Sequence, residues 1–342
     1  MKVEDSVIVL GNDVAGVGGI FNVTGGLYRK YGRKRCVDMP VSESGAVGMA
    51  IGLAMSGLRP IVECQFDAFA YPALEQIYSH VAKMKYRTAG NVTLPLVIRI
   101  PYGGGVGAVE HHSDSSEILY TAMPGLSVYT PGNAQDAYEL LHHAVRSEDP
   151  VVFFEPKRLY NKETSKPLEP ISPSIRLAEH PDAAVRRRGS ALAIICYGST
   201  AGTCSEAAEM LSDIGIDVSI VDLRCLSPIN PSKLLAAVKE CGLALIVHES
   251  TKFCGYGAEV SALIGEECFD DLKAPVRRLA GVNTPYPPPN SEKQILVGVD
   301  DVVNAAIELM DEGGTRRCRA NSHSECRIWE KGRAADGSSM CL

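Results

Sequence analysis

Short apolar stretches rich in β-branched residues alternate with helix-like stretches along this chain, and this alternation limits its fold more than any other feature. In the first half, the strand-like stretches are residues 7–10, 35–38, 60–65, 94–99, 127–129 and 151–154, and the helix-like stretches are 47–56, 73–87 and 134–146. Such alternation predicts a mostly parallel sheet that helices cover on both faces.

The pattern restarts after residue 189, with strands predicted at 191–197, 217–222, 243–248 and 276–280 and helices at 203–214, 231–241, 258–268 and 299–310. Four such units predict a second, smaller domain. We therefore expect an α/β protein with two doubly wound domains, residues 1–165 and 189–312. The proline-rich residues 166–188 are predicted to be a linker, and the Arg-, Ser- and Gly-rich residues 313–342 a disordered tail.

Composition excludes several classes of protein. The net charge of −7 argues against nucleic-acid binding, and no apolar run approaches the roughly 20 residues that a membrane helix needs. The N-terminus has no signal-peptide pattern, so we expect a cytoplasmic protein. The eleven cysteines form no Cys-x-x-Cys pair. Cys318, His323, Cys326 and Cys341 could hold zinc in principle, but a mobile tail is the preferred interpretation.

One carboxylate, Glu43, stands in the segment Pro-Val-Ser-Glu-Ser-Gly-Ala-Val-Gly at positions 40–48, between an extended stretch and a helix of small residues. At a strand end that faces a buried helix start, desolvation would raise the pKa of this carboxyl above its usual value of about 4.3. A helix-capping acid explains the same pattern without any function. The motif alone leaves both interpretations open.

Two further segments contain residue types that suit a binding site. Phe66, Phe69 and Tyr71 follow a predicted strand, where aromatic side chains are either core residues or a platform for a planar ligand. A glycine-rich loop with His111 and His112 follows the strand at 94–99, where open α/β sheets bind ligands. On an extended segment the two histidines face opposite ways, which favours one histidine in the cavity over a metal-binding pair. The loop lacks the helix start and the later acid of a dinucleotide fingerprint.

Several motifs resemble those of one family, the beta subunits of thiamine-diphosphate-dependent 2-oxo acid dehydrogenases. The first domain contains Glu-Ser-Gly-Ala-Val-Gly, Gln-Phe-Asp-Ala-Phe, Pro-Tyr-Gly-Gly-Gly-Val-Gly-Ala-Val-Glu-His-His-Ser and Phe-Phe-Glu-Pro-Lys-Arg-Leu-Tyr. The second contains Val-Asp-Leu-Arg-Cys-Leu-Ser-Pro, Val-His-Glu and Gly-Tyr-Gly-Ala-Glu. The similarity runs in collinear order from residue 7 to about residue 310. It implies a pyrimidine-binding transketolase-like domain followed by a transketolase C-terminal-like domain.

The resemblance also implies roles for individual residues. Glu43 would be the acid that holds N1′ of the aminopyrimidine of thiamine diphosphate. Phe69 and Gln65 would lie beside the cofactor, and His112 would assist acyl transfer to a lipoyl group. The family's structural potassium site would use the backbone carbonyls of Leu94, Leu96, Val97, Ala144, Ser147 and Asp149. One departure from the family pattern is Asn12, which stands where an acid is common.

The family's diphosphate and magnesium motif, Gly-Asp-Gly followed by Asn-Asn, is absent from this sequence. The resemblance therefore implies half of an active site, completed by a magnesium-holding alpha subunit in an α2β2 tetramer that serves a lipoyl-bearing acyltransferase core. The motifs favour the branched-chain type of 2-oxo acid dehydrogenase. A pyruvate or acetoin dehydrogenase beta subunit and a catalytically idle scaffold remain as alternatives.

Overall fold

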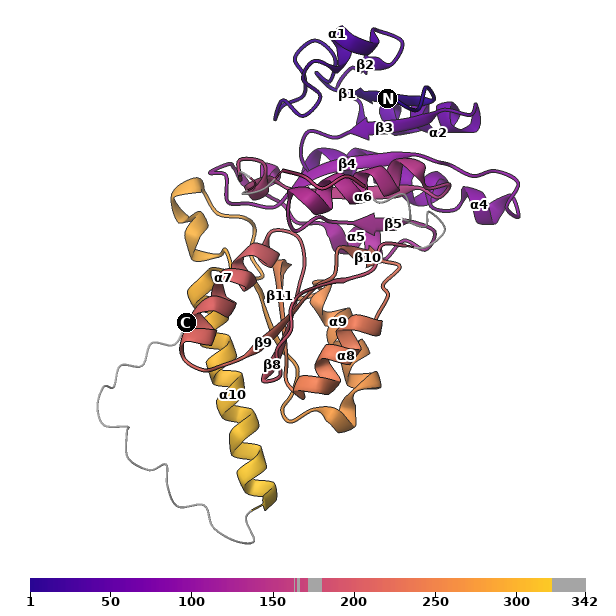
Figure 1. The fold of residues 1–342 in the computed structure, drawn as a ribbon. Helices are drawn as coiled ribbons and strands as arrows, with labels where there is room; N and C mark the ends of the chain where they lie inside the picture. The colour runs from indigo at the N-terminus through magenta and orange to yellow at the C-terminus, as the bar shows by residue number, and fades with distance from the viewer. Residues whose placement is uncertain (163, 165–166, 172–179, 322–342) are drawn as a thin grey trace.

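The computed structural model describes residues 1–321 except 163, 165–166 and 172–179, and of residues 315–321 it describes the backbone alone. The first domain is built on a seven-stranded sheet, which lies in the upper part of Figure 1. Its order is β10-β5-β6-β4-β3-β1-β2, and every neighbouring pair is parallel except β10 with β5, which is antiparallel. The strands are β1 (Val7–Gly11), β2 (Cys36–Asp38), β3 (Arg59–Glu63), β4 (Val97–Tyr102), β5 (Ser127–Tyr129), β6 (Val151–Pro156) and β10 (Cys225–Ser227).

Helices cover both faces of this sheet. Buried side chains of α2 and α5 contribute to one hydrophobic cluster, and those of α6 contribute to another on the opposite face. The helices are α1 (Leu27–Tyr31), α2 (Glu43–Met55), α3 (Leu74–Gln76), α4 (Met84–Arg87), α5 (Glu117–Thr121) and α6 (Ala134–Arg146), with short turns η1 (Ala68–Ala73), η2 (Ile77–Val81), η3 (Glu110–His112) and η4 (Lys157–Leu159).

The single helix predicted at 73–87 is instead a series of short segments. Residues 68–73 form a 3₁₀ turn that contains Pro72, and residues 77–81 form a π turn between α3 and α4. A proline cannot donate an amide hydrogen bond, and a π turn adds one residue to the helical repeat. Both interrupt the regular ladder that the apolar spacing predicts.

The second domain has a five-stranded sheet in the order β12-β11-β8-β9-β7. Along β8, Leu192 and Ile194 belong to the cluster that contains α7 and α10, whereas Ala193 and Ile195 belong to the cluster that contains α8 and α9. The prediction of two doubly wound α/β domains is therefore confirmed. The elements are β7 (Ala184–Arg187), β8 (Leu192–Cys196), α7 (Thr200–Asp213), β9 (Val218–Asp222), α8 (Ser232–Cys241), β11 (Ala244–Thr251), α9 (Gly257–Glu267), η5 (Phe269–Asp271), β12 (Arg277–Gly281), η6 (Pro289–Gln294) and α10 (Val299–Asn321).

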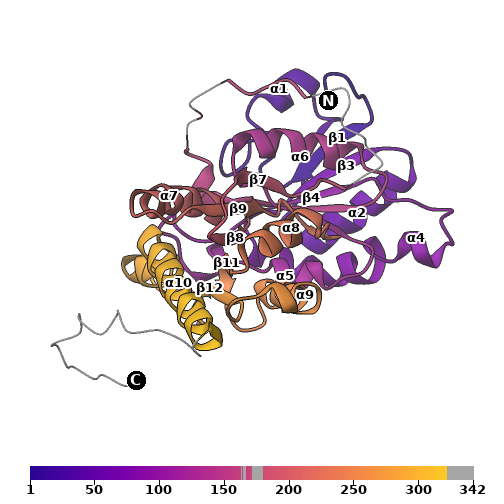
Figure 2. The same cartoon turned by 60° about the horizontal axis from the view of Figure 1, so that its bottom comes forward.

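Two observed elements extend beyond the predicted domain boundaries. β7 lies inside the predicted linker at 166–188 and pairs antiparallel with β9 at the edge of the second sheet. Its sequence, Ala-Val-Arg-Arg, has no apolar pattern that would predict a strand. Arg186 of this strand forms ion pairs with Asp222 and Asp136. Helix α10 lies beside α7 in Figures 1 and 2.

The predicted tail begins later than residue 313, because α10 continues to Asn321. Glycine disfavours a helix interior, but Gly313 is buried against Leu243, and a Cβ there would meet the leucine at 3.0 Å. A small residue therefore suits this close packing. Residues 322–342, with the zinc candidates His323, Cys326 and Cys341, lie outside the described residues.

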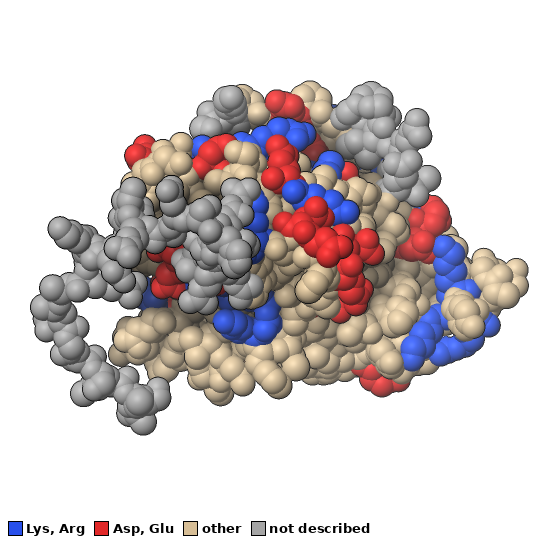
Figure 3. Space-filling view, turned by 90° about the horizontal axis from the view of Figure 1, so that it is seen from below, with Lys and Arg blue, Asp and Glu red and all other residues tan. Residues whose placement is uncertain are grey.

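On one face of the molecule, charged side chains of both signs lie near one another (Figure 3). On the face seen in Figure 3, Lys and Arg side chains lie among Asp and Glu side chains, and wide areas carry neither. Within the described part of the chain, no helix is long and apolar enough to cross a membrane.

A buried polar chain joins the two domains. Glu117 of α5 accepts a hydrogen bond from the Tyr197 hydroxyl at 2.6 Å, Tyr197 lies 3.4 Å from Ser250 Oγ, and Ser250 Oγ lies 3.0 Å from His248 Nδ1. Burial raises the pKa of Glu117 to about 7 and lowers the pKa of His248 to about 4. Between about pH 4.5 and pH 7, Glu117 is therefore mostly protonated in the folded protein and mostly ionised in the unfolded chain.

We predict that Glu117→Gln changes how stability depends on pH. A raised pKa stabilises the fold below the ordinary value of 4.5, and this contribution is lost as pH rises through about 7. The thermal midpoint of the wild type, relative to the variant, should fall by about 5 °C between about pH 5 and pH 7.5. Scanning calorimetry measures it, with Glu266→Gln on the exposed face of α9 as control. Parallel curves for Glu117→Gln and the wild type would contradict the assignment.

Candidate active site

Glu43 is the first residue of α2 and lies half-buried. Its carboxylate accepts no hydrogen bond from any residue that the structure describes. The sequence predicts a desolvated acid, but Glu43 is only half-buried, and Val41 and Ser42 before it are exposed. The carboxylate is thus free to bind a group supplied from outside this chain.

Helix α2 brings Glu43 to the end of β3. The helix packs against β3 and η1, and its small or branched side chains Ala46, Val47 and Ala50 are buried there. Cys64, directly after β3, is buried, and its thiol pKa rises to about 12, first through burial and then through the negative charge of Glu43. Glu43 therefore lies close to the segment that carries Gln65 and the aromatic residues.

The aromatic side chains after β3 surround His112. The ring centroid of His112 lies 4.2 Å from that of Phe66 and 5.2 Å from that of Phe69, with edge-to-face geometry in both pairs. Phe66 also contacts Phe21, at 5.7 Å. Both Phe66 and Phe69 are only half-buried, so they are not residues of the core. We call Phe66, Phe69 and His112 the aromatic cluster.

The two neighbouring histidines have different surroundings. The side chain of His111 is 49% exposed, and its Nδ1 lies 3.1 Å from Glu110 Oε1. Nδ1 of His112 is buried and has no hydrogen-bond partner among the described residues, and the pKa of His112 is lowered by burial and then by the charges of His111 and Lys157. The predicted extended segment is instead the 3₁₀ turn η3, so the prediction that the two histidines face opposite ways is wrong. Their ring centroids are 4.6 Å apart, and both rings lie beside Phe69.

Lys157 is a buried cation that the sequence analysis did not single out, although it lies in the motif Phe-Phe-Glu-Pro-Lys. The residue is 1% exposed, and its Nζ lies 5.6 Å from the centroid of the Phe66 ring. Within the described chain Nζ has no hydrogen-bond partner, and burial lowers the pKa of the ammonium to about 8. The negative charge that most opposes this lowering of the pKa is that of the buried carboxylate of Asp67. Lys157 thus places positive charge beside the aromatic cluster.

Comparison with known proteins identifies the two domains. Residues 1–163 match the transketolase pyrimidine-binding domain, and residues 182–302 match the transketolase C-terminal domain. The chain is 42% identical to the 3-methyl-2-oxobutanoate dehydrogenase subunit beta of Mycobacterium tuberculosis over 317 residues, which are 91% of this chain and 88% of that protein. This chain belongs to the family of 2-oxo acid dehydrogenase beta subunits.

Other members of the family agree over similar lengths. The 2-oxoisovalerate dehydrogenase subunit beta of Pseudomonas aeruginosa is 41% identical, with 83% of this chain and 84% of that protein covered. The pyruvate dehydrogenase E1 component subunit beta of Leifsonia xyli is 40% identical, with 90% and 89% covered. A solved split-gene transketolase, described as an inactive beta4 tetramer, shares the fold at 23% identity and a TM-score of 0.72, with 91% of this chain and 94% of that chain covered. As a beta subunit, the chain has an alpha subunit as its partner.

In this beta subunit, the glycine-rich loop before His112 is held by the second domain. The amide of Gly104 donates to Glu249 Oε1, and the amides of Gly105 and Gly107 donate to Glu292. The sequence predicts that this loop binds ligands. In the structure, however, its glycine amides bind carboxylates of the same chain. Glu249 lies in the motif Val-His-Glu, whereas Glu292 lies in a proline-rich stretch and has no local signal.

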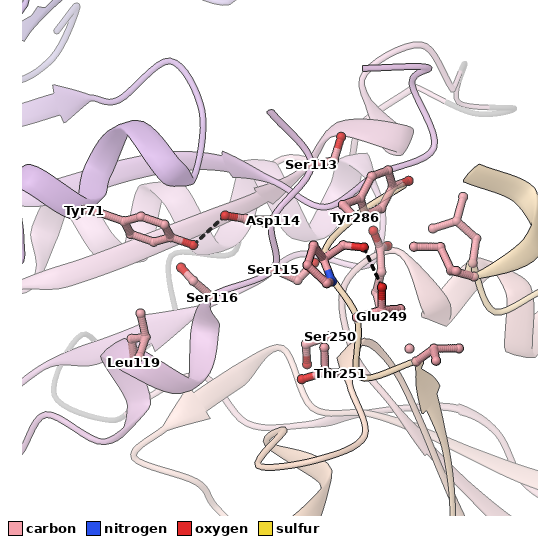
Figure 4. A pocket seen from close by; sticks show the side chains of 16 residues that line it. Tyr71, Ser113, Asp114, Ser115, Ser116, Leu119, Glu249, Ser250, Thr251 and Tyr286 are labelled. Atoms are coloured by element: carbon pink, nitrogen blue, oxygen red, sulfur yellow. Dashed lines mark hydrogen bonds between the residues drawn. The ribbon is translucent and has the colours of Figure 1, made fainter. Parts of the chain in front are cut away.

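A cavity of about 280 Å³ lies beside this loop, between the two domains. In Figure 4, Glu249 and Tyr286 of the second domain lie on one side of it and Tyr71 and Leu119 of the first domain on the other. The Tyr71 hydroxyl donates to Asp114 Oδ2 at 2.8 Å. The cavity therefore belongs to the junction of the domains and is lined by both polar and apolar side chains.

Cofactor candidate Gln65 has a partner within this chain, because its Nε2 donates to Asp13 Oδ2 at 3.2 Å. Asp13 follows Asn12, the position at which this sequence departs from the family pattern. The carboxamide is half-buried at the end of β3, next to Phe66. Gln65 therefore lies at the edge of the aromatic cluster, linked to the loop after β1.

The six carbonyls assigned to potassium lie in two segments that β4 and β6 bring together, because Val97 pairs with Val151. Most already accept one hydrogen bond, and the Ser147 carbonyl accepts from the Arg59 guanidinium at 2.9 Å. A carbonyl oxygen has two lone pairs, so an oxygen-only set still suits a hard cation. No cluster of His, Cys, Asp or Glu suited to a metal occurs among the described residues. The carbonyls are those of Leu94, Leu96, Val97, Ala144, Ser147 and Asp149.

We predict that Lys157→Met raises the pKa of His112. The variant removes a positive charge that disfavours protonation of the imidazole, while the apolar side chain keeps the volume of the buried site. An NMR titration of the histidine Cε1 protons measures the pKa, with His112 assigned by its loss in His112→Asn. Lys85→Met is the matched control, since Lys85 is half exposed and pairs with Asp149. An unchanged or lower pKa in Lys157→Met would refute the electrostatic link.

Proposed function

We propose that this chain is the beta subunit of a branched-chain 2-oxo acid dehydrogenase, which decarboxylates 2-oxo acids oxidatively and transfers the acyl group to a lipoyl domain. The observation that carries the proposal is the identity of 42% and 41% to beta subunits named for 3-methyl-2-oxobutanoate and 2-oxoisovalerate, over both domains. The acid Glu43 at the start of α2 and the histidine His112 beside an aromatic cluster support it.

Pyruvate is the main alternative substrate, because a pyruvate dehydrogenase beta subunit is almost as similar, at 40% identity. A reaction on acetoin would use the same cofactor and the same site residues. One methylene in a pocket changes the relative rate by only about 10- to 200-fold, and part of the pocket belongs to the alpha subunit. An idle scaffold is less well supported, since a scaffold has no chemical need for Glu43 and His112.

We propose thiamine diphosphate as the cofactor. When bound, it supplies the carbanion chemistry that decarboxylation of a 2-oxo acid requires. The residues of this chain fit its aminopyrimidine end: Glu43 has a half-buried carboxylate without a partner in the described chain, and Phe69 offers an aromatic face nearby. Glu43 would hold N1′, and Phe69 and Gln65 would flank the ring.

Two residues of this chain then have separate roles in proton transfer. Glu43 exchanges a proton at its carboxylate as a general acid–base group. The lowered pKa of His112 keeps the imidazole largely neutral near pH 7, so that it can accept a proton during acyl transfer. Phe66 and Phe69 pack against the imidazole, and its Nδ1 is buried.

The alpha subunit completes the site under this proposal. It would carry the Gly-Asp-Gly and Asn-Asn residues that hold magnesium and the diphosphate, which this sequence lacks. We propose an α2β2 tetramer that docks on a lipoyl-bearing acyltransferase core, with potassium at the carbonyls between β4 and α6. The oxygen-only donor set supports that ion, and the cationic Arg59 on the Ser147 carbonyl weighs against it.

Co-expression with the alpha subunit tests the function. We predict that kcat/KM for 3-methyl-2-oxobutanoate exceeds that for pyruvate by about tenfold or more, as differences of one or two carbon groups in a pocket allow. The assay follows reductive acylation of a lipoyl domain. A preference for pyruvate would instead identify the chain as a pyruvate dehydrogenase beta subunit. An assembled tetramer that is inactive on both acids and on acetoin would support the idle scaffold.

We predict that Glu43→Gln leaves the fold and the assembly intact and slows cofactor activation about 10²- to 10⁴-fold, because an amide cannot exchange a proton with N1′. The loss should be equal for every 2-oxo acid. Quenched NMR of C2 proton exchange in the tetramer measures it, with Glu75→Gln as control, since Glu75 is an exposed acid of α3. A rate within about threefold of the wild type, far below that range, would leave Glu43 as a helix cap.

A further inference from the structure

The loop that carries His112 is closed at its base and attached to the second domain at its tip. The amide of Gly103 donates to the Asp114 carbonyl at 2.7 Å, which closes the loop where it leaves β4. The next residues bend away from the sheet toward β11 and η6, where Glu249 and Glu292 lie. His112 is within this closed segment, so its position depends on how the segment is held.

The loop backbone is shaped to bind anions. Gly103, Gly105 and Gly107 all have left-handed φ angles, +79°, +84° and +70°. Alternation of such residues with ordinary ones turns successive amides inward and forms a concave nest for negative charge. The nest is filled from within the chain: Gly104 donates to Glu249 Oε1 at 2.5 Å and Gly105 donates to Glu292 Oε1 at 2.5 Å.

Gly107 completes the set, because its amide donates to Glu292 Oε2 at 3.1 Å. Both oxygens of Glu292 are therefore used by the loop, and Oε1 also accepts from the Tyr286 hydroxyl at 2.6 Å. Glu292 is 8% exposed. A buried carboxylate needs donors of this kind, and here nearly all of them are amides of the other domain.

The second carboxylate is held from both domains. The side chain of Glu249 is 8% exposed and forms an ion pair with Arg158 at 3.0 Å, and the Ser199 hydroxyl donates to it. Arg158 follows Lys157 directly, so the same short turn supplies the buried cation beside the aromatic cluster. A Cβ on Gly103 would meet Glu249 at 2.7 Å. The glycines thus allow the carboxylates to reach the backbone.

We propose that Glu292 and Glu249 are positioning residues that fix His112 through the backbone of its loop, so that the second domain controls acyl transfer. This inference rests on the proposed function for the role of His112, but the attachment of the loop stands on the contacts alone. A free anionic ligand is not the occupant of the nest, because the two carboxylates already take its amides. Neither carboxylate touches the aromatic cluster directly in the described contacts.

Hydrogen exchange tests the attachment without reference to activity. In the full-length chain, Glu292→Gln replaces one acceptor oxygen by an amide donor that faces the Gly107 amide. We expect exchange of the peptide spanning 103–112 to become about tenfold faster, with the rest of the chain unchanged. Glu308→Gln is the matched control, since Glu308 pairs with Arg277 on the exposed side of α10. Unchanged loop exchange in a folded Glu292→Gln chain would overturn the inference.

Kinetics in the assembled tetramer test the effect on His112. Glu292→Gln should slow reductive acylation of a lipoyl domain about tenfold, while C2 proton exchange, which depends on Glu43, stays within about threefold of the wild type. Tyr286→Phe is the second variant and should give a smaller change in the same direction, because it removes one donor to Glu292 and leaves the carboxylate in place.

The outcomes separate the two proposals. A wild-type tetramer without activity on any 2-oxo acid defeats the proposed function, and the exchange experiment still decides whether the loop is attached. An active wild type with normal acyl transfer in Glu292→Gln defeats the positioning role. Equal losses in acyl transfer and C2 exchange would also defeat it, because they show a general disturbance of the site. If Glu292→Gln does not fold, Tyr286→Phe decides by the same two measurements.

Discussion

Three neighbouring central strands of the first sheet are tied together by one buried guanidinium. Arg99 of β4 is 4% exposed at its side chain and pairs with Glu63 of β3 at 2.5 Å and with Glu155 of β6 at 2.5 Å. Tyr160 donates to Glu155 as well. Buried charges are costly unless their partners and hydrogen bonds are complete, and loss of one partner leaves an uncompensated charge worth about 3–5 kcal/mol. This arrangement ties β3, β4 and β6 together, and its partners Glu63 and Glu155 lie close in sequence to Phe66 and Lys157 of the site.

Most strands of the two sheets could be predicted because each is a short apolar run in the local sequence. β8 is an uninterrupted apolar run, since parallel strands covered on both faces need apolar residues on both. β7 could not be predicted in the same way. Its Arg186 satisfies the buried aspartates Asp136 and Asp222, and a charged edge strand has the composition of a linker. The helix predicted at 73–87 failed because apolar spacing does not report a π turn.

The features of the site likewise divide into those that the local sequence predicts and those that it does not. Glu43 and His112 stand out in the sequence because a charged or titratable residue in a small-residue or glycine-rich segment is unusual. Their surroundings depend on residues far away in the chain: Gly107 and Glu292 are 185 positions apart, and Lys157 reaches the aromatic cluster only because β6 lies beside β4. The burial expected for Glu43 is not provided by this chain. No local pattern in one subunit describes surface that its partner covers.

The strand β10 has a consequence for how the polypeptide is made. It comes from the second half of the chain but adds to the edge of the first sheet, antiparallel to β5, with Cys225 opposite Tyr129 and the Arg224 carbonyl bound by the Thr130 amide. During synthesis, the edge of β5 stays unpaired until almost a hundred further residues have been added. An unpaired edge beside buried aromatic side chains is a site for pairing with other chains. The edge of the first sheet is therefore completed only after the second half of the chain has been made.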